Sequence, residues 1–227
     1  MTVHLQRELD RLKKKILSLS ALVEQRVRQA VKSVEERDGQ LAQQVIDGDD
    51  QIDHAEVEIE EDCLKILALH QPVAVDLRFI VAVLKINNDL ERIGDLAVNI
   101  AERAVYLATS DTPGLLFDFP GEAAKGHAML RNSLDALVNL DPRLARQVCA
   151  DDDEVDAINR QIYEQVKEEI RNHPENLEPL IHLLSISRHI ERIADQATNI
   201  AEDVIYMVEG KIVRHRTEDY TSGDKGQ

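Results

Sequence analysis

The sequence predicts an all-α protein made of two tandem, duplicated three-helix bundles, each with an additional short helix. Apolar residues recur three and four positions apart along most of the 227 residues, which is the period of amphipathic helices. Aromatic residues make up only 3%, Trp is absent, and Gly and Pro are few, so the composition favours helices over strands. One twelve-residue sequence also occurs twice, about a hundred residues apart, which indicates a duplicated unit.

The first half begins with a long helix and a short one. Helical periodicity is expected over residues 5–34, where apolar side chains mark one face. The run Arg37-Asp38-Gly39 ends this helix. A short helix over residues 41–46 then ends at Gly48.

Two further helices complete the first half. Asp49 and Asp50 stand where an N-cap is expected, and the helix that follows ends at Gln71-Pro72. A long helix then runs to about residue 108, and Asp76 near its start is expected to cap it. Four apolar residues in its first turns are expected in the core: Val73, Val75, Phe79 and Val83.

The domain boundaries follow from a segment rich in Pro and Gly. Residues 1–110 are expected to form the first bundle, residues 111–121 a linker and residues 122–214 the second bundle. The polar tail, residues 215–227, is expected to be disordered.

The second half repeats the elements of the first. After a helix to about residue 140, Asp141-Pro142 opens a short helix with Pro at its first position. Asp152 and Asp153 are expected to cap the next helix, which ends at His173-Pro174. A final long helix ends near Gly210.

Charge and cysteine content exclude several classes of protein. The 27 Lys and Arg residues against 43 Asp and Glu give a net charge of −16, which argues against a nucleic acid partner. Cys63 and Cys149 lie far apart and suggest neither a disulfide framework nor a zinc site. The start, MTVHLQRELDRLKKK, has no apolar signal region, and the longest aliphatic run is too short to span a bilayer. We therefore expect a cytoplasmic protein that reaches a membrane only through protein partners.

The repeated sequence duplicates polar residues as well as apolar ones. ERIGDLAVNIAE runs from Glu91 to Glu102 and ERIADQATNIAE from Glu191 to Glu202, with nine of twelve positions identical. A repeat that served only the core would keep its apolar residues and let the polar ones change. Here Glu, Arg, Asp, Asn and the final Glu all recur, so the repeat predicts a duplicated polar site.

The polar residues of the repeat fall on one edge of a helix, opposite the apolar seam. They are Glu91, Asp95, Asn99 and Glu102 in the first copy and Glu191, Asp195, Asn199 and Glu202 in the second. Carboxylates four residues apart repel each other by a few tenths of a kcal/mol, so a compensating charge is expected. Oxygen ligands suit hard or borderline cations, here Mg, Mn or Fe, and the absence of Cys and His disfavours zinc.

A second helix would have to complete such a metal site. The duplicated pairs Asp50/Asp53 and Asp153/Asp156 open the preceding helix in each half, and Asp53 and Asp156 are the expected additional ligands. Their spacing leaves open whether they lie level with Glu91 or with the far end of the repeat.

Two alternatives stand beside the metal site. Arg92 and Arg192 each precede an Asp by three residues, and Arg188 precedes Glu191 by three, so the carboxylates could form ordinary surface ion pairs worth about 0–1 kcal/mol. The chain would then be a metal-free helical scaffold. A carboxylate-bridged metal enzyme is disfavoured because the Glu-x-x-His signature of di-iron bundles is missing. No catalytic residue or nucleotide-binding motif is identified, and we expect no enzyme.

The stretch QPVAVDLRFI…LERIGDLAVNIAE, followed by HIERIADQATNIAEDVIYMVEG, resembles the PhoU family over nearly the whole chain. The resemblance implies a cytoplasmic, self-associating protein, here a homodimer, of two similar three-helix bundles. It implies a negative regulator of the phosphate-starvation response that links the ATPase subunit of the phosphate-specific ABC transporter to a phosphate-sensing histidine kinase and restrains phosphate uptake. Some members bind metal clusters through E(D)xxxD motifs, which fall on Glu91/Asp95 and Glu191/Asp195 here.

Overall fold

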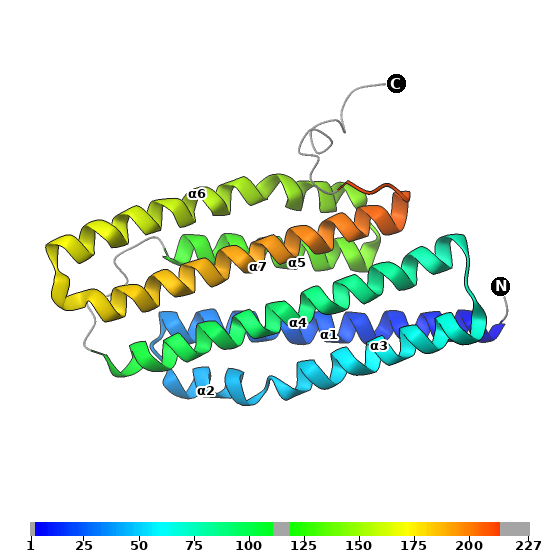
Figure 1. Ribbon diagram of the computed structural model, residues 1–227, viewed down its shortest axis with the longest axis horizontal. Coiled ribbons are helices and arrows are strands. Elements are labelled where there is room, and N and C mark those ends of the chain that lie inside the picture. Colours follow the sequence, from blue (N-terminus) through cyan, green and yellow to red (C-terminus); the bar gives the residue numbers. More distant parts are fainter. Residues whose placement is uncertain (1–2, 111–118, 214–227) are drawn as a thin grey trace, which may run out of the picture.

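The computed structural model describes residues 3–110 and 119–213, which form helices and contain no strand, as the sequence predicted (Figure 1). The helices of the first half are α1 (Val3–Glu35), α2 (Gly39–Asp47), α3 (Asp50–His70) and α4 (Ala74–Thr109). Those of the second half are α5 (Phe119–Asn139), α6 (Pro142–Asn172), the short 3-10 turn η1 (Pro174–Asn176) and α7 (Leu177–Glu209). None of the described helices is both long and apolar enough to cross a membrane.

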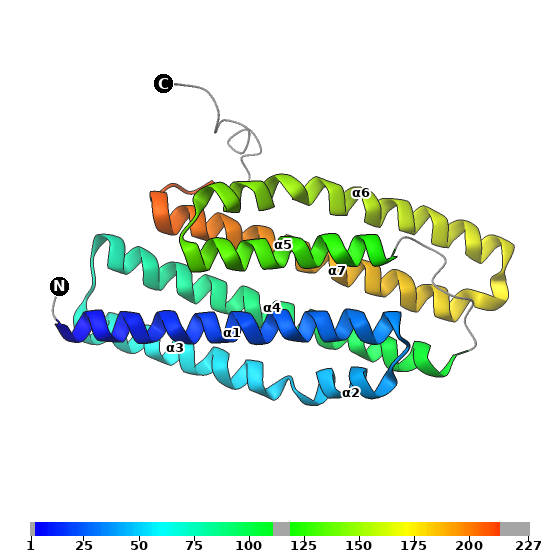
Figure 2. The ribbon, with the colours of Figure 1, turned by 180° about the vertical axis from the view of Figure 1, so that it is seen from behind.

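The two halves share one hydrophobic core. In each half three long helices lie side by side, α1, α3 and α4 in the first and α5, α6 and α7 in the second (Figures 1 and 2). Helix α4 packs along α7, and α1 lies beside α5. A single contiguous cluster of buried side chains therefore runs through both halves, with Ile86 and Ile93 from α4 and Ile190 and Ile193 from α7 among its members.

Polar contacts align the ends of the seam between α4 and α7. At one end Lys85 Nζ of α4 lies 3.0 Å from Asp203 Oδ1 of α7. At the other end the rings of Tyr106 and His182 stack with their centroids 4.0 Å apart. Because the two contacts lie at opposite ends of antiparallel helices, they fix the register of one half against the other.

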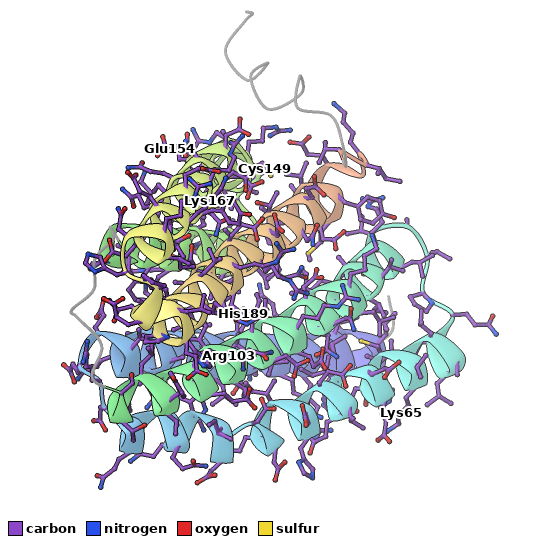
Figure 3. The ribbon with its side chains drawn as sticks, turned by 60° about the vertical axis from the view of Figure 1, so that its left-hand side comes forward. Lys65, Arg103, Cys149, Glu154, Lys167 and His189 are labelled. Atoms are coloured by element: carbon purple, nitrogen blue, oxygen red, sulfur yellow. The ribbon has the colours of Figure 1, made fainter. Side chains whose placement is uncertain are left out.

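His189 lies in this seam next to Arg103 of the facing helix (Figure 3). Burial lowers the pKa of His189 to about 4, and the positive charges of Arg103, Arg192 and Arg188 act in the same direction. Its ring Nε2 lies 3.3 Å from Ser185 Oγ. The imidazole is therefore neutral at pH 7, and the seam does not contain a buried imidazolium.

The same turn joins the first two helices of each half. Arg37 and Leu140 adopt positive φ angles of 52° and 51°, and each is followed by an Asp that caps the next helix. Asp38 Oδ1 accepts hydrogen bonds of 3.0 Å from the amides of residues 40 and 41. Asp141 Oδ1 accepts bonds of 2.9 and 3.3 Å from the amides of residues 143 and 144, and Pro142 takes the first helical position, as predicted.

The predicted break before Asp152 and Asp153 is wrong, because α6 continues through both residues. The sequence from residue 143 to residue 172 contains neither Gly nor Pro, so nothing interrupts the helical hydrogen bonds. In the first half Gly48 occupies the corresponding position, and the Arg26 guanidinium fills the space that a side chain there would need. Gly48 thus stands at the bend between α2 and α3, whereas the corresponding residue, Asp151, lies inside the continuous α6.

Asp49 does not cap α3 either. Its backbone is helical, at φ −63° and ψ −41°, and its side chain makes no capping hydrogen bond. Since α2 and α3 are separated only by the bend at Gly48, the first amides of α3 find backbone acceptors, and the Asp49 carboxylate remains available for other contacts.

Three further expectations are corrected at the helix ends. Residues 119–121, which the sequence assigned to the linker, begin α5, whereas residues 111–118 and the tail from residue 215 lie outside the described residues. Val83 is in the core and Phe79 packs against it, but Val73 and Val75 are 74% and 61% exposed. They belong to the α3–α4 turn and the first turn of α4, which no neighbouring described helix covers. Asp76 also makes no capping bond, since the N-cap position is Val73.

We expect Asp141→Ala to lower the free energy of unfolding by about 1 kcal/mol, because two amides of α6 lose their acceptor. Asp153→Ala removes the same side chain from the middle of α6, and we expect it to change stability by no more than a few tenths of a kcal/mol. Urea denaturation followed by circular dichroism measures both. Equal losses would show that Asp153 caps a helix after all.

Candidate metal-binding site

Carboxylates of α3 and α4 face one another and form what we call the first acidic cluster. Burial raises the pKa of Glu91, and the charges of Asp95, Glu56 and Asp53 raise it further. Burial and Asp53 raise the pKa of Asp95. The pKa of Asp49 is raised by burial and then by Asp53 and Asp95. The cluster thus consists of five carboxylates from two helices: Asp49, Asp53, Glu56, Glu91 and Asp95.

The second acidic cluster occupies the corresponding place between α6 and α7, and consists of Asp152, Asp156, Glu191 and Asp195. Burial raises the pKa of Asp152 to about 6, and the charges of Asp195 and Asp156 contribute. Burial also raises the pKa of Asp195 to about 6, with contributions from Glu191 and Asp156. The pKa of Glu191 is raised by burial and by Asp156. Carboxylates that raise one another's pKa lie in a region of strong negative potential, which attracts cations.

Helix geometry explains why these carboxylates meet. Residues four apart lie on one face of a helix, and both helices of each pair carry acids at this spacing. Gly94 brings α3 close to α4 in the first half, because a Cβ at this position would lie only 3.0 Å from Ile52 Cδ1. Ala194 replaces it in the second half and is also buried.

The structure brings together six of the eight predicted ligands, three in each cluster: Asp53, Glu91 and Asp95, and Asp156, Glu191 and Asp195. The predicted Asn residues differ from these. Asn99 Nδ2 donates to the Asp95 backbone carbonyl at 2.8 Å and is thereby held on its own helix. Asn199 is half-buried one turn beyond Asp195.

Sequence reasoning missed three acids and a hydroxyl. Asp49, Asp152 and Glu56 belong to the clusters, and Thr198 Oγ1 lies 3.3 Å from Asp152 Oδ1, to which it donates a hydrogen bond. Asp49 and Asp152 were expected to cap helices. The available signal was spacing, because Asp49 precedes Asp53 by four residues, just as Glu91 precedes Asp95.

The alternative of ordinary surface ion pairs finds little support. Arg92 and Arg192 are exposed, and among the described side chains neither forms an ion pair with the Asp three residues later. Their charges do lower the pKa of Glu91, Glu191 and Asp195, but burial and the neighbouring carboxylates outweigh them. Each cluster therefore retains uncompensated negative charge.

The donor set suits a cation, but the side chains are not gathered around one point. Within residues 3–110 and 119–213, no three His, Cys, Asp or Glu side chains approach closely enough to hold one metal ion as they stand. The clusters contain only oxygen donors, which fits Mg, Mn or Fe. Binding would require the carboxylates of the paired helices to rotate toward one another, a small change for exposed and half-buried side chains.

Replacing Asp195 by Asn removes one of four mutually repelling carboxylates. We expect the metal-free protein to gain about 0.5–1 kcal/mol of unfolding free energy at pH 7.5 and low salt. Glu168→Gln removes the same charge from an exposed site on α6 and should change stability by only a few tenths. Urea denaturation in the presence of a chelator compares them. If both variants gain equally, the effect comes from net charge and not from the cluster.

The pH dependence of stability follows from the raised pKa values of Asp152 and Asp195, both about 6 in the folded protein. Because each folded value lies above the unfolded one, the native protein binds these protons between roughly pH 4 and 6 when the unfolded chain does not. Protonation of these two carboxylates therefore favours the folded protein as the pH falls from 7.5 to 5.5, whereas the neutral imidazole of His189 opposes folding over the same interval, because only the unfolded chain gains a proton there. His189 is unchanged in Asp195→Asn, so the stability advantage of this variant over the parent still shrinks over this interval. Thermal melts in chelator measure the difference, and a constant difference would contradict the raised pKa.

The sequence matches the PhoU domain twice, over residues 5–104 and 123–204, so each copy contains one acidic cluster. A phosphate-specific transport system accessory protein, PhoU homolog, from Aquifex aeolicus is 39% identical over 212 residues, which are 92% of this chain and 95% of the relative. The homolog from Pseudomonas aeruginosa is 35% identical over 97% of this chain and 93% of its own length.

Solved structures agree with these matches. The crystal structure of PhoU from Pseudomonas aeruginosa superposes with a TM-score of 0.87 at 36% identity, covering 91% of this chain and 99% of that one. The phosphate transport system regulatory protein PhoU from Streptococcus pneumoniae gives a TM-score of 0.85 at 26% identity, over 92% and 99% of the two chains. With the PhoU domain matched over both halves and relatives 35–39% identical over more than nine tenths of the chain, this chain belongs to the PhoU family.

Proposed function

We propose that this protein is a negative regulator of the phosphate-starvation response. It acts in the cytoplasm as an adaptor between the phosphate-specific ABC transporter and a phosphate-sensing histidine kinase, and it restrains phosphate uptake. The names of its relatives support this role, since they describe an accessory or regulatory protein of a phosphate transport system. These names do not describe an enzyme, in agreement with the expectation from the sequence.

The observation that carries the proposal is the pair of acidic clusters, one in each PhoU domain and each between the last two long helices of its half. A protein that only needed to fold would gain from neutralising some of these carboxylates. In the proposed adaptor each cluster holds Mg, Mn or Fe ions. Asp53, Glu91 and Asp95 supply ligands in the first cluster, and Asp156, Glu191 and Asp195 supply them in the second.

Bound cations would stabilise the structure electrostatically and would not take part in catalysis. They would relieve the repulsion between α3 and α4, and between α6 and α7, and so set the spacing of the helices in each pair. The chain itself would present a negative surface to its partners, the transporter ATPase subunit and the kinase, and would do so as a homodimer. The competing proposal of a metal-free scaffold differs in one measurable respect, the metal content of the purified protein.

Complementation tests the regulatory role. Expressed in a bacterium that lacks its own copy of the regulator, the parent protein should restore repression of alkaline phosphatase in phosphate-rich medium. The double variants Glu91→Ala/Asp95→Ala and Glu191→Ala/Asp195→Ala should remain helical, bind less metal by mass spectrometry and leave the phosphatase near the level of the strain without the regulator.

A matched control is Glu61→Ala/Glu168→Ala, which removes one exposed carboxylate from each half outside the clusters and should regulate normally. Failure of the well-folded parent to repress would overturn the regulatory proposal. Normal regulation by both cluster variants, together with a parent free of metal, would leave a metal-free scaffold as the correct description.

A further inference from the structure

The end of the molecule formed by the α3–α4 turn exposes apolar side chains that the core does not use. Besides Val73 and Val75, Leu69 and Leu77 are exposed on the two helices that meet at this turn. Leu140, directly after α5, is exposed as well. Figure 1 shows that the end of α7 lies at the same end of the molecule, where Ile212 is 69% exposed. Isolated exposed apolar residues are common, but a group of them around one feature marks an interaction site.

Two of these residues, Val75 and Leu140, line a cavity of about 250 Å³ between the first turns of α1, the start of α4 and the end of α5. Seven apolar side chains form most of its wall: Leu9, Ile16, Leu17, Val75, Phe79, Leu137 and Leu140. Its volume is below the roughly 300–1,000 Å³ of small-molecule sites, so it suits one or two inserted side chains better than a whole metabolite.

The backbone of the α3–α4 turn holds the exposed residues in a defined conformation. Gln71 and Ala74 adopt φ angles of 47° and 51°, which residues other than Gly, Asn and Asp rarely do. Pro72 lies between them and is buried. Unfavourable backbone conformations concentrate at functional sites, and here they present Val73 and Val75 to solvent.

The walls of the cavity favour a helical occupant. Among the described residues there is no strand, so an extended peptide has no sheet edge to pair with. Helices α1 and α5 lie side by side at this face (Figure 2), and a groove between helices accepts the apolar face of another helix.

The charged residues at the edge of the cavity indicate which charges a docking helix should carry beside its apolar face. Asp10 and Asp76 line the cavity together with a single cation, Lys13, in a chain whose net charge is −16. A partner with Lys or Arg beside its apolar anchor would complement the two carboxylates.

We propose that this cavity docks an amphipathic helix of a partner protein. The helix inserts a large aliphatic or aromatic side chain between Val75 and Leu140 and places a basic residue beside Asp10 and Asp76. The identity of the partner rests on the proposed function, in which it is the transporter ATPase subunit or the kinase. The surface itself rests only on the residues described above.

A synthetic peptide tests the surface without any natural partner. The probe is an 18-residue fluorescent helix of Leu and Lys with one Phe anchor, and its binding is measured by fluorescence anisotropy. Val75→Asp and Leu140→Asp should each weaken binding roughly tenfold, the loss typical of a central apolar contact. The matched control is Val57→Asp, since Val57 is 50% exposed on α3 outside the cavity. All three variants add a negative charge, so attraction of the basic peptide to an acidic protein cannot produce this pattern.

Equal affinity of the three variants would overturn the proposal, and so would a peptide whose Phe→Ser version binds equally well. Val75, Leu140 and Val57 are all exposed, so circular dichroism should show unchanged helix content in each variant. Perturbed methyl signals of Val75, Leu137 and Leu140 in NMR spectra would place the bound peptide directly.

The same variants are then measured against the purified ATPase subunit and the cytoplasmic part of the kinase. Loss of binding by Val75→Asp and Leu140→Asp, but not by Val57→Asp, supports the surface as the docking site for that partner. Undiminished binding by all three overturns it for these partners. If the parent protein binds neither, the proposed function fails, and the peptide measurement still decides whether the surface docks a helix.

Two other occupants are outcomes of the test. Vesicles containing anionic phospholipid that bind the parent but not Val75→Asp would make the surface a lipid contact. A dimer that sedimentation detects in the parent and not in Val75→Asp would make it an interface between two copies of this chain. Either result overturns the proposal of a partner helix.

Discussion

The packing of α4 against α7 is the contact on which the rest of the structure depends. Each helix turns an apolar stripe into the shared core, Ile93, Ala97 and Ile100 on α4 and Ile193, Ala197 and Ile200 on α7, and none of these is more than 1% exposed. Burying this stripe fixes the rotation of each helix about its axis. Because the α-helix has 3.6 residues per turn, the directions of all other side chains on the helix are then fixed as well. Glu91 and Asp95, and their counterparts in the second half, are thereby directed toward α3 and α6. The core sets the position of the acidic clusters.

Repulsion among the carboxylates of each cluster lowers the stability of the folded protein, and burial of apolar side chains in the core more than compensates for it. Their carboxylates raise one another's pKa, which is a loss of favourable interaction for the charged forms at neutral pH. The loss is on the order of 1 kcal/mol for exposed or half-buried groups, whereas a single fully buried Leu or Ile contributes about 1.5–3 kcal/mol. A protein with such a long contiguous core can therefore maintain two regions of repulsion. Sites that oppose stability in this way are typical of binding functions.

The sequence predicted features that are set by residues close together along the chain. It missed features that are set by contacts with other helices in the folded protein. Helix periodicity, the helix start at Asp141-Pro142 and the paired polar edges are local properties, and the structure contains them. The break predicted before Asp152 followed the pattern of the first half, where Gly48 stands at the bend, but residues 143–172 contain no Gly or Pro and form one helix. Asp49 was expected to cap because its residue type favours that role, but the amides of residues 51–53 already donate to the backbone carbonyls of Gly48 and Asp49. The helical period of α4 alone places Val75 on the apolar face, but no described helix covers this face at the first turn of α4, so Val75 is exposed.

Helix α4 connects the two proposed binding regions. Val75 and Asp76 in its first turn border the apolar cavity, and Glu91 lies 16 residues further along, a separation of roughly 24 Å at 1.5 Å per residue. Helix α3 contributes Asp53, and the residue just before it contributes Asp49, to the first cluster; α3 then leads directly into the turn that holds Val73. A cation that drew α3 toward α4 would act on both ends of this hairpin, since neither helix contains a Pro or a break between the cluster and the turn. The second half lacks this arrangement, because the corresponding turn, at η1, lies at the opposite end of the molecule and borders no apolar cavity among those described. If both proposals hold, cation binding in the first domain is the one positioned to influence partner docking.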